Sequence, residues 1–149
     1  MPASPPEAAR FGLDVSLTLE AVEAAQDRLA AWLAARAVPG DAGYRLRLVL
    51  DELLANLVMH GRFAGDPPPA RIDATLGATE ILLAIEDAAE PFDPRAAPTP
   101  APATLEGEKI GGLGLALVGR MAAIRAYDRL PSGRNRTLLA IPLAGPGPG

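Results

Sequence analysis

Apolar residues recur along the first part of the chain with two different spacings, and each spacing predicts one kind of element. Alternation of apolar and polar residues predicts a strand over residues 12–19. The apolar side chains on one face of that strand are Leu13, Val15, Leu17 and Leu19. Residues 20–37 are instead rich in alanine, leucine and charged side chains, which predicts a helix that Pro39 and Gly40 stop.

A second helix is predicted from Asp41, which can cap its first turn, to about Gly61, a natural stop. Its apolar residues follow the first of them by three, four, seven and eleven positions, so they share one helix face. These residues are Leu46, Val49, Leu50, Leu53 and Leu57. The pattern therefore predicts a helix that packs this face against a core.

The rest of the chain predicts four strands and one helix, separated by proline and glycine. The strands are residues 71–76, 80–86, 124–130 and 136–142, the helix is residues 113–123, and a long loop covers residues 91–108. Strands and helices do not alternate strictly, which excludes a doubly wound parallel sheet. The order predicts an α+β, two-layer sandwich: a mixed, mostly antiparallel sheet with helices on one face.

Composition limits the class of protein. The 149 residues contain no cysteine and one histidine, which excludes disulfides, cysteine-based zinc sites and sites that need two imidazoles. The net charge of −4 argues against a nucleic-acid binder.

No segment has the signature of a membrane span or a signal peptide, so a cytoplasmic protein is expected. Proline and glycine gather at both ends, which predicts one domain over residues 11–143 between flexible segments 1–10 and 144–149.

Glu52 and Asn56 are the first candidates for chemistry. They lie four residues apart on the second predicted helix, at the margin of its apolar face. A carboxylate there can activate a hydroxyl or water, and an amide oxygen can bind a hard cation. The plain alternative is the polar edge of a surface helix.

Two further segments carry candidate ligand groups. Asp87 ends an apolar strand, where its carboxylate can accept a hydrogen bond from an exocyclic amine, or simply be solvated. Glycines at 111, 112 and 114 open the last helix, and exposed backbone N–H groups there suit phosphates. Lys109, the only lysine of the chain, lies two residues before Gly111, where a cation would suit an anionic ligand.

The order and spacing of these pieces resemble the GHKL (histidine kinase/Hsp90-like) ATPase superfamily, and most closely its anti-sigma-factor serine/threonine kinase branch. Residues 52–61 resemble the N box of that branch, residues 87–94 its first glycine box, and residues 110–118 its second. Tyr127 and the sequence Gly133-Arg134-Asn135 are similar to the end of these domains. The resemblance covers residues 13–143 and implies a Bergerat-type ATP-binding fold.

The resemblance also implies roles. Glu52 would be the catalytic base, Asn56 would ligate Mg2+, Asp87 would bind the adenine amino group, and residues 97–108 would form a lid. Together with Lys109, proposed from its charge, the other candidate ATP-binding positions are Ala89, Phe92, Gly111, Gly112, Leu113, Gly114 and Leu115. The implied activity is phosphorylation of a STAS-type anti-anti-sigma protein. A sigma factor or another regulator would be the second partner, and a homodimer is possible within the family.

Ala89 departs from the family pattern, which usually has glycine two residues after the aspartate. If the backbone there needs a positive φ, alanine costs about 1 kcal/mol or more. This departure leaves an alternative function open: an ATP-dependent partner-binding switch that transfers no phosphate.

Overall fold

The computed structural model describes residues 9–91 and 118–144. The described elements, in chain order, are β1 (Arg10–Val15), α1 (Leu19–Ala35), α2 (Gly40–His60), β2 (Ala70–Leu76), β3 (Glu80–Asp87), β4 (Ala123–Arg129) and β5 (Asn135–Pro142). Every strand predicted from the sequence is present. Of the last predicted helix, residues 118–121 are described and are helical.

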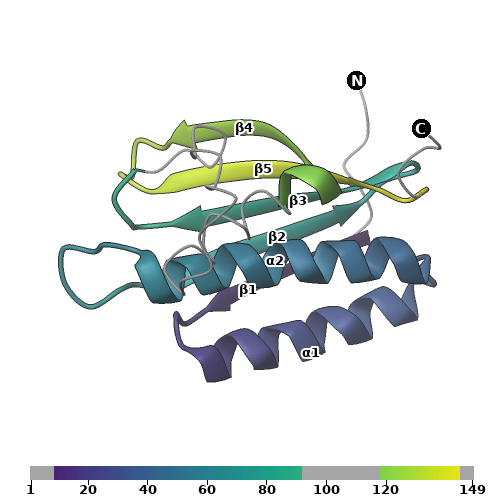
Figure 1. Cartoon of the computed structure of the whole chain (residues 1–149), viewed down its shortest axis with the longest axis horizontal. Coiled ribbons are helices and arrows are strands. Elements are labelled where there is room, and N and C mark those ends of the chain that lie inside the picture. The colour runs from purple at the N-terminus through teal and green to yellow at the C-terminus, as the bar shows by residue number, and fades with distance from the viewer. Residues whose placement is uncertain (1–8, 92–117, 145–149) are drawn as a thin grey trace, which may run out of the picture.

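The five strands form one sheet in the order β1-β2-β3-β5-β4, and each of the pairings between them is antiparallel. Both helices lie on the same face of this sheet (Figure 1). The predicted two-layer α+β sandwich is therefore confirmed. Within the described ranges, no helix is both long and apolar enough to cross a membrane.

The core lies between the two layers. Leu46, Leu50 and Leu54 of α2 are completely buried, as are Ile81 of β3 and Leu139 of β5. The three leucines are four residues apart, so they lie along one side of α2. Buried residues on the strands follow the two-residue alternation of a strand, so the sheet presents an apolar face to the helix. This packing fixes the position of α2 over the central strands.

The junction between β1 and α1 differs from the prediction. The strand ends at Val15, so the alternation that continues to Leu17 and Leu19 is not strand, and Leu19 is 67% exposed. The helix begins at Leu19 because the Thr18 side chain accepts a hydrogen bond from the N–H of Ala21 at 3.1 Å. A side-chain oxygen at this position satisfies one of the free N–H groups of the first turn.

The start of α2 also corrects a prediction. Asp41 does not cap the helix: it lies inside the first turn, Pro39 occupies the cap position, and no side chain caps the N-terminus. The helix does end before Gly61, as predicted, but with an extended backbone (φ −63°, ψ 140°). Glycine is required there by space, because a Cβ would lie 2.5 Å from the carbonyl oxygen of Leu57.

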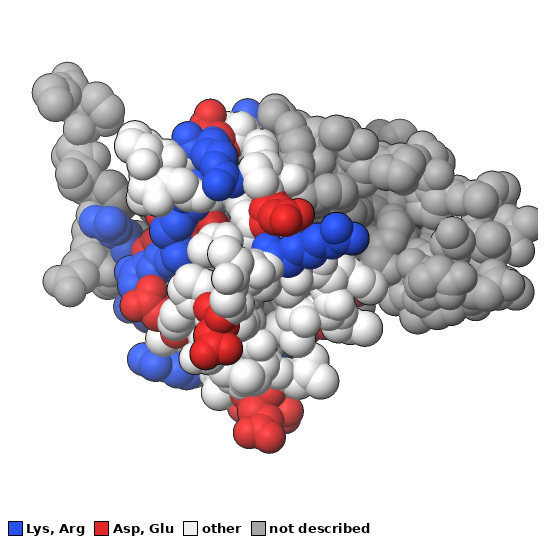
Figure 2. Space-filling view, turned by 90° about the vertical axis from the view of Figure 1, so that its left-hand side faces the viewer, with Lys and Arg blue, Asp and Glu red and all other residues white. Residues whose placement is uncertain are grey.

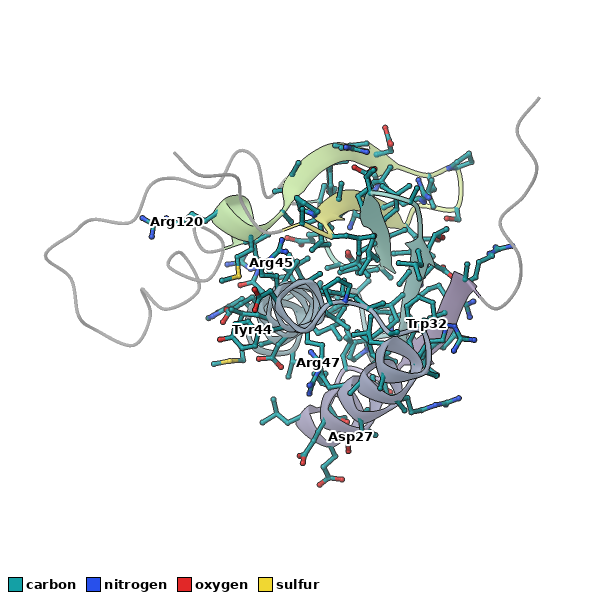
Figure 3. All side chains as sticks on the ribbon, turned by 90° about the vertical axis from the view of Figure 1, so that its right-hand side faces the viewer. Asp27, Trp32, Tyr44, Arg45, Arg47 and Arg120 are labelled. Atoms are coloured by element: carbon teal, nitrogen blue, oxygen red, sulfur yellow. The ribbon has the colours of Figure 1, made fainter. Side chains whose placement is uncertain are left out.

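A polar contact joins the two helices. Gln26 of α1 donates from Nε2 to the carbonyl oxygen of Arg47 at 2.7 Å and accepts from Nε of Arg47 at 3.3 Å. Figure 3 shows Arg47 between α1 and α2, while Tyr44 lies on the outer side of α2. The buried Gln26 thus has both ends of its amide satisfied, as burial of a polar group requires.

Several other element boundaries lie one or two residues from their predicted positions. The last predicted helix ends at Met121 rather than residue 123, because β4 already begins at Ala123. Strands β2, β3 and β5 each include one residue that the alternation did not assign to them: Ala70, Asp87 and Asn135. The last two of these become important for the site, because the ladder pairs them with each other.

Candidate functional site

The candidate site lies at the end of the sheet where α2 and β3 end and β5 begins, on the left of Figure 1. A backbone hydrogen bond of 2.8 Å from the N–H of Glu90 to the carbonyl oxygen of Arg62 joins the segment after β3 to the segment after α2. The second half of α2, with Glu52 and Asn56, therefore leads to the same end of the molecule as Asp87.

Glu52 and Asn56 are half-buried on α2. They are four residues apart, so their side chains lie on neighbouring turns of one helix side. With the residues that the structure describes, neither side chain forms a hydrogen bond or an ion pair. The roles of Glu52 and Asn56 in ligand binding stay predictions from the sequence.

Asp87 forms the turn that follows β3. Its side chain lies on the helix-covered face of the sheet, because Ile85 and Leu83 precede it at two-residue spacing and are buried in the core. Its Oδ1 accepts two hydrogen bonds, from the N–H of Ala89 at 3.0 Å and from Nδ2 of Asn135 at 2.9 Å. Its Oδ2 forms none within the described ranges and is left as a free acceptor.

Asn135 is the residue of this site to which sequence reasoning gave no role. It is 2% exposed and makes four hydrogen bonds. Nδ2 donates to Asp87 and to the carbonyl oxygen of Ala89 at 2.8 Å, and Oδ1 accepts from Tyr127 Oη at 3.0 Å and Arg129 Nη1 at 3.2 Å. The motif Gly133-Arg134-Asn135 marked the position, but not its pairing with Asp87.

The hairpin between β4 and β5 brings Asn135 to this place. Gly133 adopts a φ of 87°, a conformation that glycine reaches at little cost, and its N–H donates to the carbonyl oxygen of Leu130 at 2.8 Å. Arg134 then donates from Nη2 to the carbonyl oxygens of Pro69 and Glu86 at 3.0 and 3.3 Å. The hairpin is thus held to the ends of the neighbouring strands.

Ala89 has an ordinary backbone. It is 6% exposed, and among the described residues other than glycine only Ala37 has a positive φ. The backbone cost that a positive φ would impose on alanine is therefore absent. Both backbone polar groups of Ala89 are paired, the N–H with Asp87 and the carbonyl with Asn135.

The remaining predicted ATP-binding residues lie outside the described ranges. They are Phe92, Lys109, Gly111, Gly112, Leu113, Gly114 and Leu115, together with the predicted lid at residues 97–108. The structure thus bears on the predicted base-binding turn and on the α2 side of the site.

Few side chains in the described part of the chain are placed to bind a cation. No group of three acidic or histidine side chains gathers there. Asn56 offers one amide oxygen, a donor set that suits Mg2+, which keeps several waters and takes its other ligands from substrate phosphates. Figure 2 shows acidic and basic side chains interspersed at this end of the molecule, rather than one continuous charge.

Comparison with known proteins gives the class. Residues 15–141 match the family of histidine kinase-like ATPase domains, and this match covers most of the 149 residues. The chain therefore belongs to the histidine kinase-like ATPase domain family, and it is an ATP-binding domain of that class. None of the curated proteins matches the sequence.

Solved structures confirm the Bergerat-type fold. The structure of the RsbU and RsbW domains of Rv1364c from Mycobacterium tuberculosis matches with a TM-score of 0.61 and 15% identity, over 89% of this chain and 32% of that one. This chain thus spans about a third of that protein's length. A chain of the SiaB–SiaC complex from Pseudomonas aeruginosa matches with a TM-score of 0.57 and 15% identity, over 89% of both chains.

Proposed function

We propose that this protein is an Mg2+- and ATP-dependent serine/threonine kinase that phosphorylates a STAS-type anti-anti-sigma protein. The observation that carries the proposal is the hydrogen bond between Glu90 and Arg62. It holds the end of α2, the helix of Glu52 and Asn56, beside the turn of Asp87. This contact supports the assignment of Glu52, Asn56 and Asp87 to one nucleotide site.

Glu52 is assigned the role of general base. The hydroxyl oxygen of the substrate serine or threonine forms a bond to the γ-phosphorus of ATP as the bond from that phosphorus to the β–γ bridging oxygen breaks. The hydroxyl proton passes to the Glu52 carboxylate, and ADP leaves. Phosphoryl transfer depends mainly on positioning and on stabilisation of charge, so one correctly placed carboxylate suffices for the proton.

Asn56 is assigned to Mg2+, and Asp87 to the adenine amino group. When bound, Mg2+ neutralises charge on the transferring phosphates. Among the described residues, none donates a hydrogen bond to Asp87 Oδ2, and the adenine amino group is a donor. The glycines at 111, 112 and 114 are assigned to the phosphates, as their sequence pattern suggests.

The choice of protein partners rests on family resemblance and on the fold. One similar fold is that of a chain in the SiaB–SiaC complex, and the other belongs to a protein with RsbU and RsbW domains. We assign this domain a protein substrate of the STAS type. A sigma factor or another regulator is assigned as its second partner, and the domain itself is assigned as a homodimer.

Transfer of labelled phosphate from ATP to a STAS protein encoded near this one tests the proposal. In Glu52→Gln the side chain keeps its shape but loses its basicity. We expect transfer to fall by about 10²–10⁴-fold while ATP affinity changes less than about threefold. Asp51→Asn is the matched control, because Asp51 is an exposed carboxylate on the adjacent position of the same helix.

Two results would contradict the proposal. Transfer that survives Glu52→Gln rejects Glu52 as the base. ATP binding without transfer to any STAS protein, together with partner binding that depends on ATP, identifies a switch that transfers nothing. The ordinary backbone of Ala89 removes one reason for preferring that second function.

A further inference from the structure

The hydrogen bonds of Asn135 give its amide a single orientation. Tyr127 and Arg129 both present donors to its oxygen, at 3.0 and 3.2 Å. Asp87 and the carbonyl of Ala89 both present acceptors to its nitrogen, at 2.9 and 2.8 Å. A flipped amide would place its oxygen against two acceptors and its nitrogen against the Arg129 guanidinium, which can only donate, so the network selects one orientation.

This orientation determines which oxygen of Asp87 can meet a ligand. Oδ1 receives two donors, Asn135 Nδ2 and the N–H of Ala89, while Oδ2 receives none within the described part of the chain. Rotation of the carboxylate would break both bonds to Oδ1 inside a region where Asp87 is only 9% exposed. The carboxylate is therefore held with one oxygen fixed and the other free.

We propose that Asn135 is a positioning residue that sets the selectivity of the site for adenine. By occupying Oδ1, it aims the free acceptor Oδ2 at the base. An acceptor at this point attracts the 6-amino group of adenine and repels the 6-oxo group of guanine or hypoxanthine. The proposal rests on the assignment of Asp87 to adenine, and adds the residue that makes this assignment selective.

Titration calorimetry with ATP and with purine riboside triphosphate, which lacks only the 6-amino group, measures this role. For the unchanged protein we expect ATP to bind tenfold to about a hundredfold more tightly, because the missing group is a hydrogen-bond donor to a carboxylate. In Asn135→Ala the Asp87 carboxylate loses one of its two hydrogen bonds to Oδ1 and is held only by the N–H of Ala89. We expect ATP affinity to fall about tenfold and affinity for the analogue to change less than about threefold, so that selectivity is largely lost.

Arg136→Ala is the matched control. Arg136 is the next residue of β5, and its side chain is on the opposite face of the sheet from Asn135. We expect this variant to keep the affinity and selectivity of the unchanged protein. If Asn135→Ala does not fold, Asn135→Ser, whose hydroxyl keeps one donor, is expected to show the same loss of selectivity to a smaller degree.

The outcomes separate this inference from the proposed function. Equal weakening of both nucleotides by the Asn135 variants, or unchanged selectivity, overturns the positioning role while the ATP site stands. An unchanged protein that binds ATP and the analogue equally overturns the assignment of Asp87, and the role of Asn135 with it. Asp87→Asn, titrated in parallel, must abolish the preference for the 6-amino group.

Discussion

At the scale of single residues, Ala89 shows why a departure from a family pattern must be judged by its backbone. Glycine is needed where φ is positive or where a Cβ has no room. Ala89 has no positive φ, and its N–H and carbonyl are both hydrogen-bonded in the turn after β3. Alanine therefore suits this turn, although it replaces the usual glycine.

Restoring the usual glycine with Ala89→Gly is expected to weaken the protein rather than to improve the site. The free energy of unfolding should fall by about 0.5–1 kcal/mol, because glycine gains more conformational freedom in the unfolded chain. ATP affinity should change by less than about threefold. Urea unfolding and calorimetry measure the two quantities, with Ala88→Gly as the neighbouring control. A tenfold gain in ATP affinity would show that the methyl group crowds the base.

At the scale of elements, the sequence predicted correctly which helices and strands the described residues form. It predicted their first residues less well. Alternation continued to Leu19, but Thr18 starts a helix because its side chain bonds the N–H of Ala21. Asp41 had the right chemistry for a cap and stands inside the first turn instead. At α1 a local side-chain hydrogen bond, rather than the apolar pattern, decides the boundary, whereas α2 begins after Pro39 without a side-chain cap.

The two helix starts predict different responses to mutation. Thr18→Ala should lower the free energy of unfolding by about 1 kcal/mol, because it leaves an N–H of α1 unpaired. Asp41→Asn should cost no more than about 0.5 kcal/mol, since only the attraction of its charge to the helix dipole is lost. Chemical unfolding at low and high salt distinguishes them, because salt removes only the Asp41 effect. A salt-independent loss of about 1 kcal/mol in Asp41→Ala, with none in Asp41→Asn, would mean that Asp41 does cap α2, because asparagine caps a helix as well as aspartate does.

The candidate site was predictable only in part, because some of its contacts join residues far apart in the sequence. The sequence could propose roles for Glu52, Asn56 and Asp87 because each lies in a short motif. Asn135 could not be given a role, since its contact with Asp87 exists only through the register of β3 against β5, and the two residues are 48 positions apart. Strand register depends on the whole sheet and leaves no local trace in the sequence.

At the scale of the whole molecule, the residues proposed for the site belong to both layers. Glu52 and Asn56 belong to a helix, whereas Asp87 and Asn135 belong to the sheet, and the packing of Leu54 and its neighbours between the layers keeps them in place. A ligand that contacts both layers should therefore stabilise the fold as a whole.

Nucleotide binding is accordingly expected to raise the melting temperature. At an ATP concentration of about 100 times Kd, with Mg2+, the stabilisation should be about 2.7 kcal/mol, which corresponds to several degrees. GTP at the same concentration should give a much smaller shift, and Asp87→Asn should lose most of the ATP effect. Differential scanning fluorimetry measures these shifts. Equal shifts with ATP and GTP would contradict the assignment of Asp87 to the base.

The side-chain amide of Asn135, whose nitrogen and oxygen are both hydrogen-bonded, can also report spectroscopically on the candidate base site. Its two Nδ2 protons are both hydrogen-bonded, to Asp87 and to Ala89, in a side chain that is 2% exposed. Buried and bonded protons exchange slowly with water. In a nuclear magnetic resonance spectrum they should give two well-separated, persistent signals, one for each acceptor. Because Asp87 accepts one of these protons, occupation of the base site can be followed from that signal, without a label on the nucleotide.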